Sequence, residues 1–268
     1  MDNMDIFSLI KIRRSVRNYE RKSVDEDINK DLLTRSLTEG PFKNKTRFVF
    51  VSDSSRYPGN YGIIRGTSDF VAGFCANDVL SFIDFGYCME SLVLNATAMN
   101  LGTCWLGGTF NKKTFFLKAG GKTGEVLPAV VAIGYPAKKD LLENIVRNAV
   151  SADTRKPHNQ LFFDETPERP LNSETFFEIL EGVRLAPSSS NRQPWRIIKK
   201  GKTFNFYCIK NNIYDKFFPF LHYIDMGIAM FHFQKVAEQK NLKGRWLEIK
   251  PEPVNNKDWI PFFVWEFE

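Results

Sequence analysis

One stretch of the sequence returns 141 residues later, and this repeat constrains the fold more than any other feature. Residues 82–105 read FIDFGYCMESLVLNATAMNLGTCW, and residues 223–246 read YIDMGIAMFHFQKVAEQKNLKGRW. The two stretches are identical at 8 of 24 positions, where average residue usage would give roughly one or two. We therefore expect the chain to contain two related halves.

Both copies of the repeat are predicted to be helical. The first carries apolar residues at helical spacing, and Asp84 is placed to cap its N-terminus. The second is apolar on more than one face at its start, which predicts burial on several sides. We expect two long central helices packed together, each followed by a strand, at 127–135 in one half and 260–267 in the other.

The segments ahead of the central helices also correspond. Ser23-Val-Asp-Glu26 is a capping-box pattern that predicts a helix over 28–37. Asn172 or Ser173 is expected to open the matching helix, which Pro187 should end. Short strands are predicted after these helices, at 47–51 and 195–199. Each half is therefore predicted to be an α+β unit in which helices flank a short sheet.

Composition excludes several function classes. Lys and Arg outnumber Asp and Glu by 37 to 31, a net charge of +6, but the lysines follow no nucleic-acid-binding pattern. The four cysteines and three histidines are scattered, which argues against disulfides and against a metal site. No apolar run reaches the roughly 18 residues of a membrane span, and the N-terminus lacks secretory features. We expect a soluble cytoplasmic protein without metal, nucleic-acid or membrane partners.

Two motifs stand out from this scaffold. Arg13-Arg14-Ser15-Val16-Arg17 gathers three guanidinium groups and a hydroxyl, which suit a phosphate monoester, although a solvated basic surface explains them as well. The segment from Pro187 to Trp195 reads PSSSNRQPW. This loop could offer hydroxyls to a polyol or could simply connect a helix to a strand.

Together these motifs resemble the FMN-dependent nitroreductase family. Its hallmark segments read RRSxR, LAPSSxNxQPW and LGTCWLGG, and the chain carries RRSVR at 13–17, LAPSSSNRQPW at 185–195 and LGTCWLGG at 101–108. Gly134-Tyr135-Pro136 and Arg155-Lys156-Pro157 also look like family elements. The resemblance implies a nitroreductase-like fold with a mostly antiparallel sheet in each half, and with the long central helices at the interface.

One departure from the family pattern is informative. Family members are homodimers whose two flavin sites each combine RRSxR of one subunit with the serine loop of the other. Here the counterpart of the serine loop in the first half, residues 40–45, reads GPFKNK, and the counterpart of RRSVR in the second half has Gln160, Leu161, Phe162 and Asp164. The resemblance thus implies a fused pseudo-dimer, with halves at 1–158 and 159–268, that keeps one site and needs no second chain.

The resemblance also assigns residues to that site. Arg13 and Ser15 are expected to bind the FMN phosphate with Arg155, while Arg14 and Lys156 stay undecided between phosphate and solvent. Arg17 is expected at the pyrimidine edge, where its charge stabilises reduced flavin. The residues expected at the ring and the ribityl chain are Leu106, Gly107 and Gly108 from one half, and Pro187, Ser188, Ser189 and Asn191 from the other.

The function implied is an FMN-dependent oxidoreductase with a ping-pong mechanism. NADH or NADPH would reduce the flavin, and a small electron-poor acceptor such as a nitroaromatic or a quinone would reoxidise it. No catalytic acid or base is required of the protein, because the cofactor supplies the chemistry. Two alternatives stay open: a flavin-binding or interaction protein with little or no turnover, and a scaffold whose two sites have both decayed.

Overall fold

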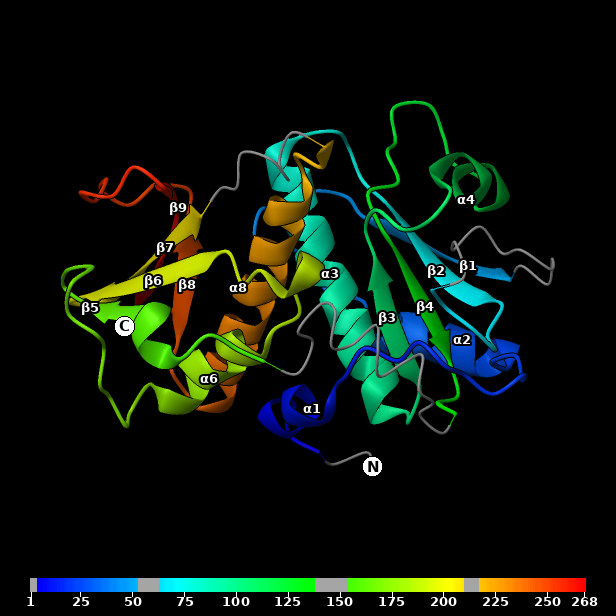
Figure 1. Cartoon of the computed structure of the whole chain (residues 1–268), viewed down its shortest axis with the longest axis horizontal. Helices are drawn as coiled ribbons and strands as arrows, with labels where there is room; N and C mark the ends of the chain where they lie inside the picture. Colours follow the sequence, from blue (N-terminus) through cyan, green and yellow to red (C-terminus); the bar gives the residue numbers. More distant parts are fainter. Residues whose placement is uncertain (1–3, 53–62, 138–153, 210–216) are drawn as a thin grey trace.

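The computed structural model describes residues 4–52, 63–137, 154–209 and 217–268, and in it two sheets flank a pair of long helices (Figure 1). The first unit contains α1 (Ile6–Ile12), α2 (Glu26–Arg35), β1 (Arg47–Ser52), β2 (Asp69–Phe74), α3 (Val79–Ala98), β3 (Gly102–Leu106), α4 (Lys112–Lys118) and β4 (Val130–Gly134). The second contains η1 (His158–Gln160), β5 (Phe162–Asp164), α6 (Phe177–Leu185), η2 (Ser189–Asn191), β6 (Trp195–Lys200), β7 (Thr203–Ile209), α8 (Leu221–Gln239), β8 (Gly244–Leu247) and β9 (Trp259–Phe267).

The two sheets have the same strand order. The described strands form one antiparallel sheet with the order β1-β2-β4-β3 and a second sheet with the order β5-β6-β7-β9-β8. Apart from β5, which joins β6 in parallel at the edge, and from α1, α4 and the two short 3₁₀ helices, each unit reads helix, strand, strand, long helix, strand, strand. The predicted fold class, α+β with helices flanking two mostly antiparallel sheets, is confirmed.

The long helices α3 and α8 lie against each other between the sheets (Figure 1). A Cβ atom added to Gly86 would stand 2.2 Å from the carbonyl oxygen of Ile224, and one added to Gly227 would stand 2.0 Å from that of Ile83. Only glycine permits backbones to approach this closely. Gly86 and Gly227 are 141 positions apart, and so are their contacts Ile83 and Ile224. The two contacts are therefore equivalent, which is the reciprocal pattern of a two-fold interface.

The ends of the two helices repeat as well. Asn100 and Asn241 follow the helix caps Met99 and Lys240, and both adopt the left-handed conformation, with φ of 61° and 58°. Asparagine tolerates this conformation better than most residues and often ends helices. The repeat in sequence therefore specifies the same local structure twice.

The expected helix caps were wrong. Asp78 caps α3, accepting a hydrogen bond from the Ser81 N–H at 2.9 Å, whereas Asp84 lies inside the helix and is fully buried. The helix expected over 28–37 begins at Glu26 after Asp25, which makes no side-chain capping bond, so the Ser23–Glu26 capping box does not form. The matching helix begins at Phe177, later than expected, and ends before Pro187.

Burial accounts for the apolar composition of the centre of the molecule. All four cysteines are free and buried. In the described chain, α3 is the one helix that is long and apolar enough to cross a membrane, but 83% of its apolar window is buried inside the protein. Its hydropathy is that of a core helix covered on all sides.

Candidate functional site

The basic segment Arg13–Arg17 lies along the edge strand of the first sheet. Arg13 caps the C-terminus of α1 and is only 9% exposed, whereas Arg14 is exposed. Ser15 pairs with Thr103 in β3, and the Val16 N–H donates to the Thr103 carbonyl at 2.8 Å. Because β3 leads directly into Leu106–Gly108, two of the predicted site segments share one sheet edge.

Arg17 provides the most direct sign of a ligand. Its carbonyl accepts a hydrogen bond from the Arg65 N–H at 2.9 Å, which fixes the backbone. Its Nη1 atom is buried and has no hydrogen-bond partner among the described residues. A guanidinium group stays charged at all relevant pH values, and burying an unsatisfied donor costs free energy. The position therefore suits a ligand that brings a hydrogen-bond acceptor.

The double glycine after β3 lies under residues of the second unit. Leu106 is buried, and a Cβ atom on Gly107 would stand 2.7 Å from the Leu221 side chain. A Cβ atom on Gly108 would stand 2.8 Å from the Phe218 ring. The backbone at this corner is thus close to the segment that enters α8.

The serine loop between α6 and β6 has an unusual backbone. Ser190, Asn191 and Gln193 all have φ between 50° and 53°, in the left-handed region, which asparagine tolerates but serine and glutamine rarely adopt. The loop is held internally by the Gln193 N–H, which donates to Ser188 Oγ at 2.9 Å. It is held from outside by the buried Asp225 on α8, which accepts from the Ser189 N–H at 2.9 Å. Pro187 is half-buried at the start of the loop.

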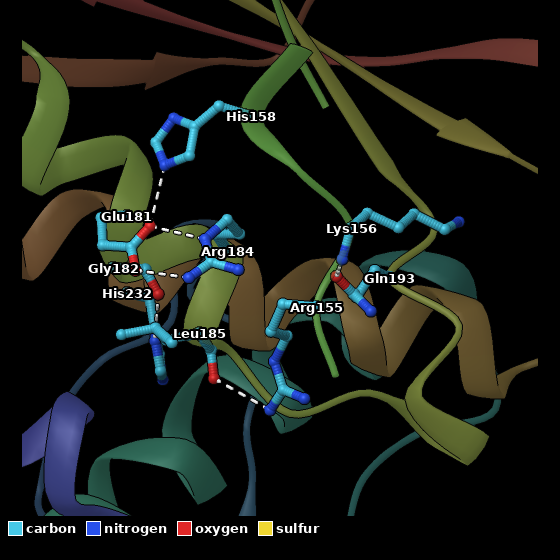
Figure 2. Close-up of polar contacts among 9 residues, drawn as sticks. All are labelled: Arg155, Lys156, His158, Glu181, Gly182, Arg184, Leu185, Gln193 and His232. Carbon is cyan, nitrogen blue, oxygen red and sulfur yellow. Dashed lines mark hydrogen bonds and ion pairs between the residues drawn. The ribbon is translucent and has the colours of Figure 1, made fainter. Parts of the chain in front are cut away.

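Arg155 joins the end of the first unit to this loop (Figure 2). Its Nη1 donates to Asn191 Oδ1 at 2.9 Å and its Nη2 donates to the Leu185 carbonyl at 3.5 Å. Asn191 in turn donates to the Thr154 carbonyl at 2.7 Å. Two predicted site residues that are 36 positions apart are therefore in direct contact.

Lys156 clamps the far side of the same loop. Its N–H donates to Gln193 Oε1 and its Nζ donates to the Arg192 carbonyl, each at 2.9 Å (Figure 2). Partial burial, with the charges of Arg196 and Arg192 nearby, lowers the pKa of Lys156 to about 8. The contacts of Lys156 hold the loop in its strained conformation.

Side-chain contacts among His158, Glu181 and Arg184 anchor the segment that carries Arg155. His158 Nε2 lies 2.8 Å from Glu181 Oε2, and Arg184 donates to both oxygens of Glu181, at 2.6 and 2.7 Å (Figure 2). Burial raises the pKa of Glu181, but the hydrogen bonds from Arg184 and His158 outweigh it and leave the pKa at about 2. This trio connects η1, which begins three residues after Arg155, to α6.

A buried polar network was not expected from the sequence. Glu90 on α3 lies 3.0 Å from Nε2 of His232 on α8, and both side chains are fully buried. Glu90 also accepts from Trp105 Nε1 at 2.9 Å, and His232 Nδ1 lies 2.8 Å from the Gly182 carbonyl. The available signal was a Glu and a His within otherwise apolar helical repeats, since such groups are rarely buried without a partner.

The counterparts of the two motifs, residues 40–45 in the first half and 160–164 in the second, make different contacts. Asp84 accepts from the N–H groups of Phe42 and Asn44, at 3.0 and 2.7 Å, and so holds the loop over 40–45 as Asp225 holds the serine loop. The Phe42 ring, however, packs 4.4 Å from the Phe263 ring. At the RRSVR counterpart, Leu161 and Phe162 are buried, Gln160 ends η1, and Asp164 pairs with Arg169 at 3.2 Å. None of these four side chains is a cation.

The described residues contain no group of three His, Cys, Asp or Glu side chains that could hold a metal ion. The candidate site is instead defined by cations, hydroxyls and backbone amides. Helix α1, which ends at Arg13, packs against α6, which ends just before the serine loop. The two motifs are thereby joined through neighbouring helices.

Comparison with known proteins identifies the family. A family model described as "Putative TM nitroreductase" matches residues 5–237, most of the chain. The chain belongs to this nitroreductase family. A search of curated proteins found no match.

One solved structure shares the fold of this nitroreductase-family protein over nearly its whole length, and others match about half of the chain. The crystal structure of a "putative nitroreductase" from Thermotoga maritima is 19% identical, with a TM-score of 0.65 over 98% of this chain and 93% of its own. A Bacteroides fragilis nitroreductase with bound FMN is 21% identical and covers 52% of this chain and 92% of its own, with a TM-score of 0.42. A Clostridium novyi nitroreductase-family protein is 19% identical and covers 51% and 89%, with a TM-score of 0.43. The Thermotoga structure shows that nearly the whole chain adopts this fold.

Proposed function

We propose that this nitroreductase-family protein is an FMN-dependent oxidoreductase that passes electrons from NADH or NADPH to small electron-poor acceptors, such as nitroaromatics or quinones. The observation that carries the proposal is Arg17, whose buried Nη1 lacks a partner among the described residues. A flavin ring edge would bring the carbonyl oxygens and ring nitrogens that such a donor needs. When bound, FMN supplies hydride and electron transfer.

The residues of the chain divide this task by their chemistry. Arg13, Ser15 and Arg155 would hold the phosphate, with Arg14 available at the exposed side. Arg17 would stabilise negative charge that develops on the ring. The loop residues Pro187, Ser188, Ser189 and Asn191 would contact the ribityl chain and ring. Leu106, Gly107 and Gly108 would bring backbone N–H groups to the reacting edge.

The preformed loop supports this division. Three left-handed residues, Asp225, Arg155 and Lys156 hold the serine loop in a single conformation. A loop held rigid in this way loses little conformational entropy when a ligand binds. A mere connection between a helix and a strand would not need such backbone strain.

We also propose that the chain is a single-chain pseudo-dimer with one flavin site, made of halves at 1–158 and 159–268. The reciprocal glycine contacts of α3 and α8 and the shared strand order support two copies of one ancestral unit. The packed Phe42 and Phe263 rings and the Asp164 carboxylate argue against a mirror-image site. Since each half supplies what the other lacks, a monomer would be complete.

A flavin titration tests this proposal. We expect the purified protein to bind one FMN per chain and to lose the oxidised-flavin absorbance when NADH or NADPH is added without oxygen. Arg17→Ala should weaken FMN binding at least 100-fold, while Asp164→Asn, at its counterpart, should change it less than twofold. Two FMN per chain would refute the single site, and absence of binding would refute the flavin proposal. Flavin that stays oxidised with both nicotinamides would favour the alternative, a flavin-binding protein with little turnover.

A further inference from the structure

An aromatic segment from the second unit lies on the double glycine of the first. Residues 217–220 read Phe-Phe-Pro-Phe and lead into α8. A Cβ atom on Gly108 would stand 2.8 Å from two carbons of the Phe218 ring, so this ring rests on the Gly108 backbone. The neighbouring Phe217, in contrast, is 70% exposed, whereas Phe218 is half-buried. A flat apolar side chain is therefore fixed where the proposed reacting edge would be.

A cation lies beside this aromatic segment. Lys112, the first residue of α4, has its Nζ 4.2 Å from the centroid of the Phe220 ring, and Phe220 packs 5.4 Å from Phe82. The residue is open to solvent, yet partial covering of its ammonium lowers its pKa. Among the ion pairs of the described residues none includes Lys112, so no carboxylate within 4.0 Å pairs with its ammonium there.

We infer that Phe218 and Lys112 form the acceptor subsite and select planar aromatic acceptors that carry a negatively charged substituent, such as a nitroaromatic carboxylate. Phe218 would stack on the ring of the acceptor, and Lys112 would pair with its carboxylate. This inference rests on the proposed function and adds the substrate class to it.

The reaction balances without a further reagent. One NADH or NADPH gives two electrons and, with one proton, converts a nitro group to a nitroso group and water, leaving NAD⁺ or NADP⁺. The carboxylate takes no part in this chemistry. Its role is recognition, so removing it should change affinity more than the rate of the bound complex.

The test compares 4-nitrobenzoate with the neutral 4-nitrobenzamide as acceptors in steady-state kinetics of the FMN-loaded full chain. Lys112→Gln should lower kcat/KM for the carboxylate about five- to tenfold relative to the amide, a loss of roughly 1 kcal/mol. Phe218→Ala should raise KM for both acceptors. Lys113→Gln and Phe217→Ala, at the adjacent positions, are the matched controls and should leave both values within twofold.

Three outcomes would overturn the inference. An unchanged carboxylate-to-amide ratio in Lys112→Gln would remove the charge recognition, and a Phe218→Ala effect no larger than that of Phe217→Ala would remove the stacking. A wild-type protein without FMN binding or nicotinamide oxidation would refute the proposed function itself. Flavin stoichiometry, circular dichroism and the Tm of each variant separate these outcomes from misfolding.

Discussion

The two helix-to-strand loops of the molecule share an anchor but differ in everything that the anchor holds. In one, Asp84 accepts backbone N–H groups from residues 40–45; in the other, Asp225, 141 positions later, accepts the Ser189 N–H. The first loop buries Phe42 against Phe263, while the second directs Asn191 to Arg155. The backbone anchor is therefore present in both halves, whereas the proposed ligand-binding side chains are found in one loop only.

In the helix pair, too, the backbone contacts occur twice while a polar side-chain contact occurs once. The contacts of Gly86 and Gly227 are reciprocal, so the helix backbones obey the two-fold relation. The Glu90–His232 pair does not, because the positions that mirror Glu90 and His232 are Phe231 and Ser91. The polar bridge therefore exists on one side of the helix pair only, where Glu90 also contacts Trp105 of the strand that leads to the double glycine.

The largest expected effect is on stability at this one-sided bridge. His232→Ala leaves Glu90 buried without one of its hydrogen-bond partners, and leaving a buried polar group unsatisfied costs about 1–3 kcal/mol. We expect urea denaturation to show a loss of that size in the free energy of unfolding. Ser91→Ala, at the mirror position, should cost less than about 1 kcal/mol. Equal small losses at both positions would show that the bridge contributes nothing specific.

Much of the fold could be predicted because it is encoded locally. The repeat predicted both central helices, and alternating or apolar runs predicted β1, β4, β6 and β9 with ends within a few residues. The helix starts were missed because several residues near each start can cap. Asp78 and Asp84 are both plausible from spacing, and the choice depends on the tertiary position of residues 40–45, which bind Asp84.

The site was predictable in its segments but not in its contacts. RRSVR, the double glycine and the serine loop are contiguous motifs that a single sequence displays. The family resemblance assigned Arg155 and Asn191 to one site but did not predict the hydrogen bond between them, and the Asp225 anchor and the Glu90–His232 bridge were missed. These contacts join residues 36 to 142 positions apart. Their formation depends on packing of whole elements, which no local pattern records.

Substitution of the two anchoring aspartates, Asp225 and Asp84, should change FMN affinity to different extents. Asp225→Ala frees the Ser189 N–H and lets the strained serine loop relax, so we expect the Kd for FMN to rise about tenfold, or about 1.4 kcal/mol. Asp84→Ala frees the N–H groups of the opposite loop and should lower the Tm while changing the Kd less than twofold. Fluorescence titration with FMN measures both variants. Equal weakening would mean that the first loop also serves the ligand.

The smallest effect concerns pH and the trio behind Arg155. Glu181 has a pKa of about 2 in the folded protein, against an ordinary value of 4.5. A carboxylate with a lowered folded pKa stabilises the fold above its unfolded pKa, and this contribution declines as the pH falls from about 4.5 toward 2. Between pH 7 and pH 4 the wild type should therefore lose about 1 kcal/mol that Glu181→Gln does not lose. Chemical denaturation at both pH values gives this difference, with Glu178→Gln, a half-exposed position on the same helix that pairs with Lys240, as the control. If Glu181→Gln and the wild type lose the same stability, the charge of Glu181 does not stabilise the segment that carries Arg155. The position of Arg155 would then depend on its contacts with the serine loop alone.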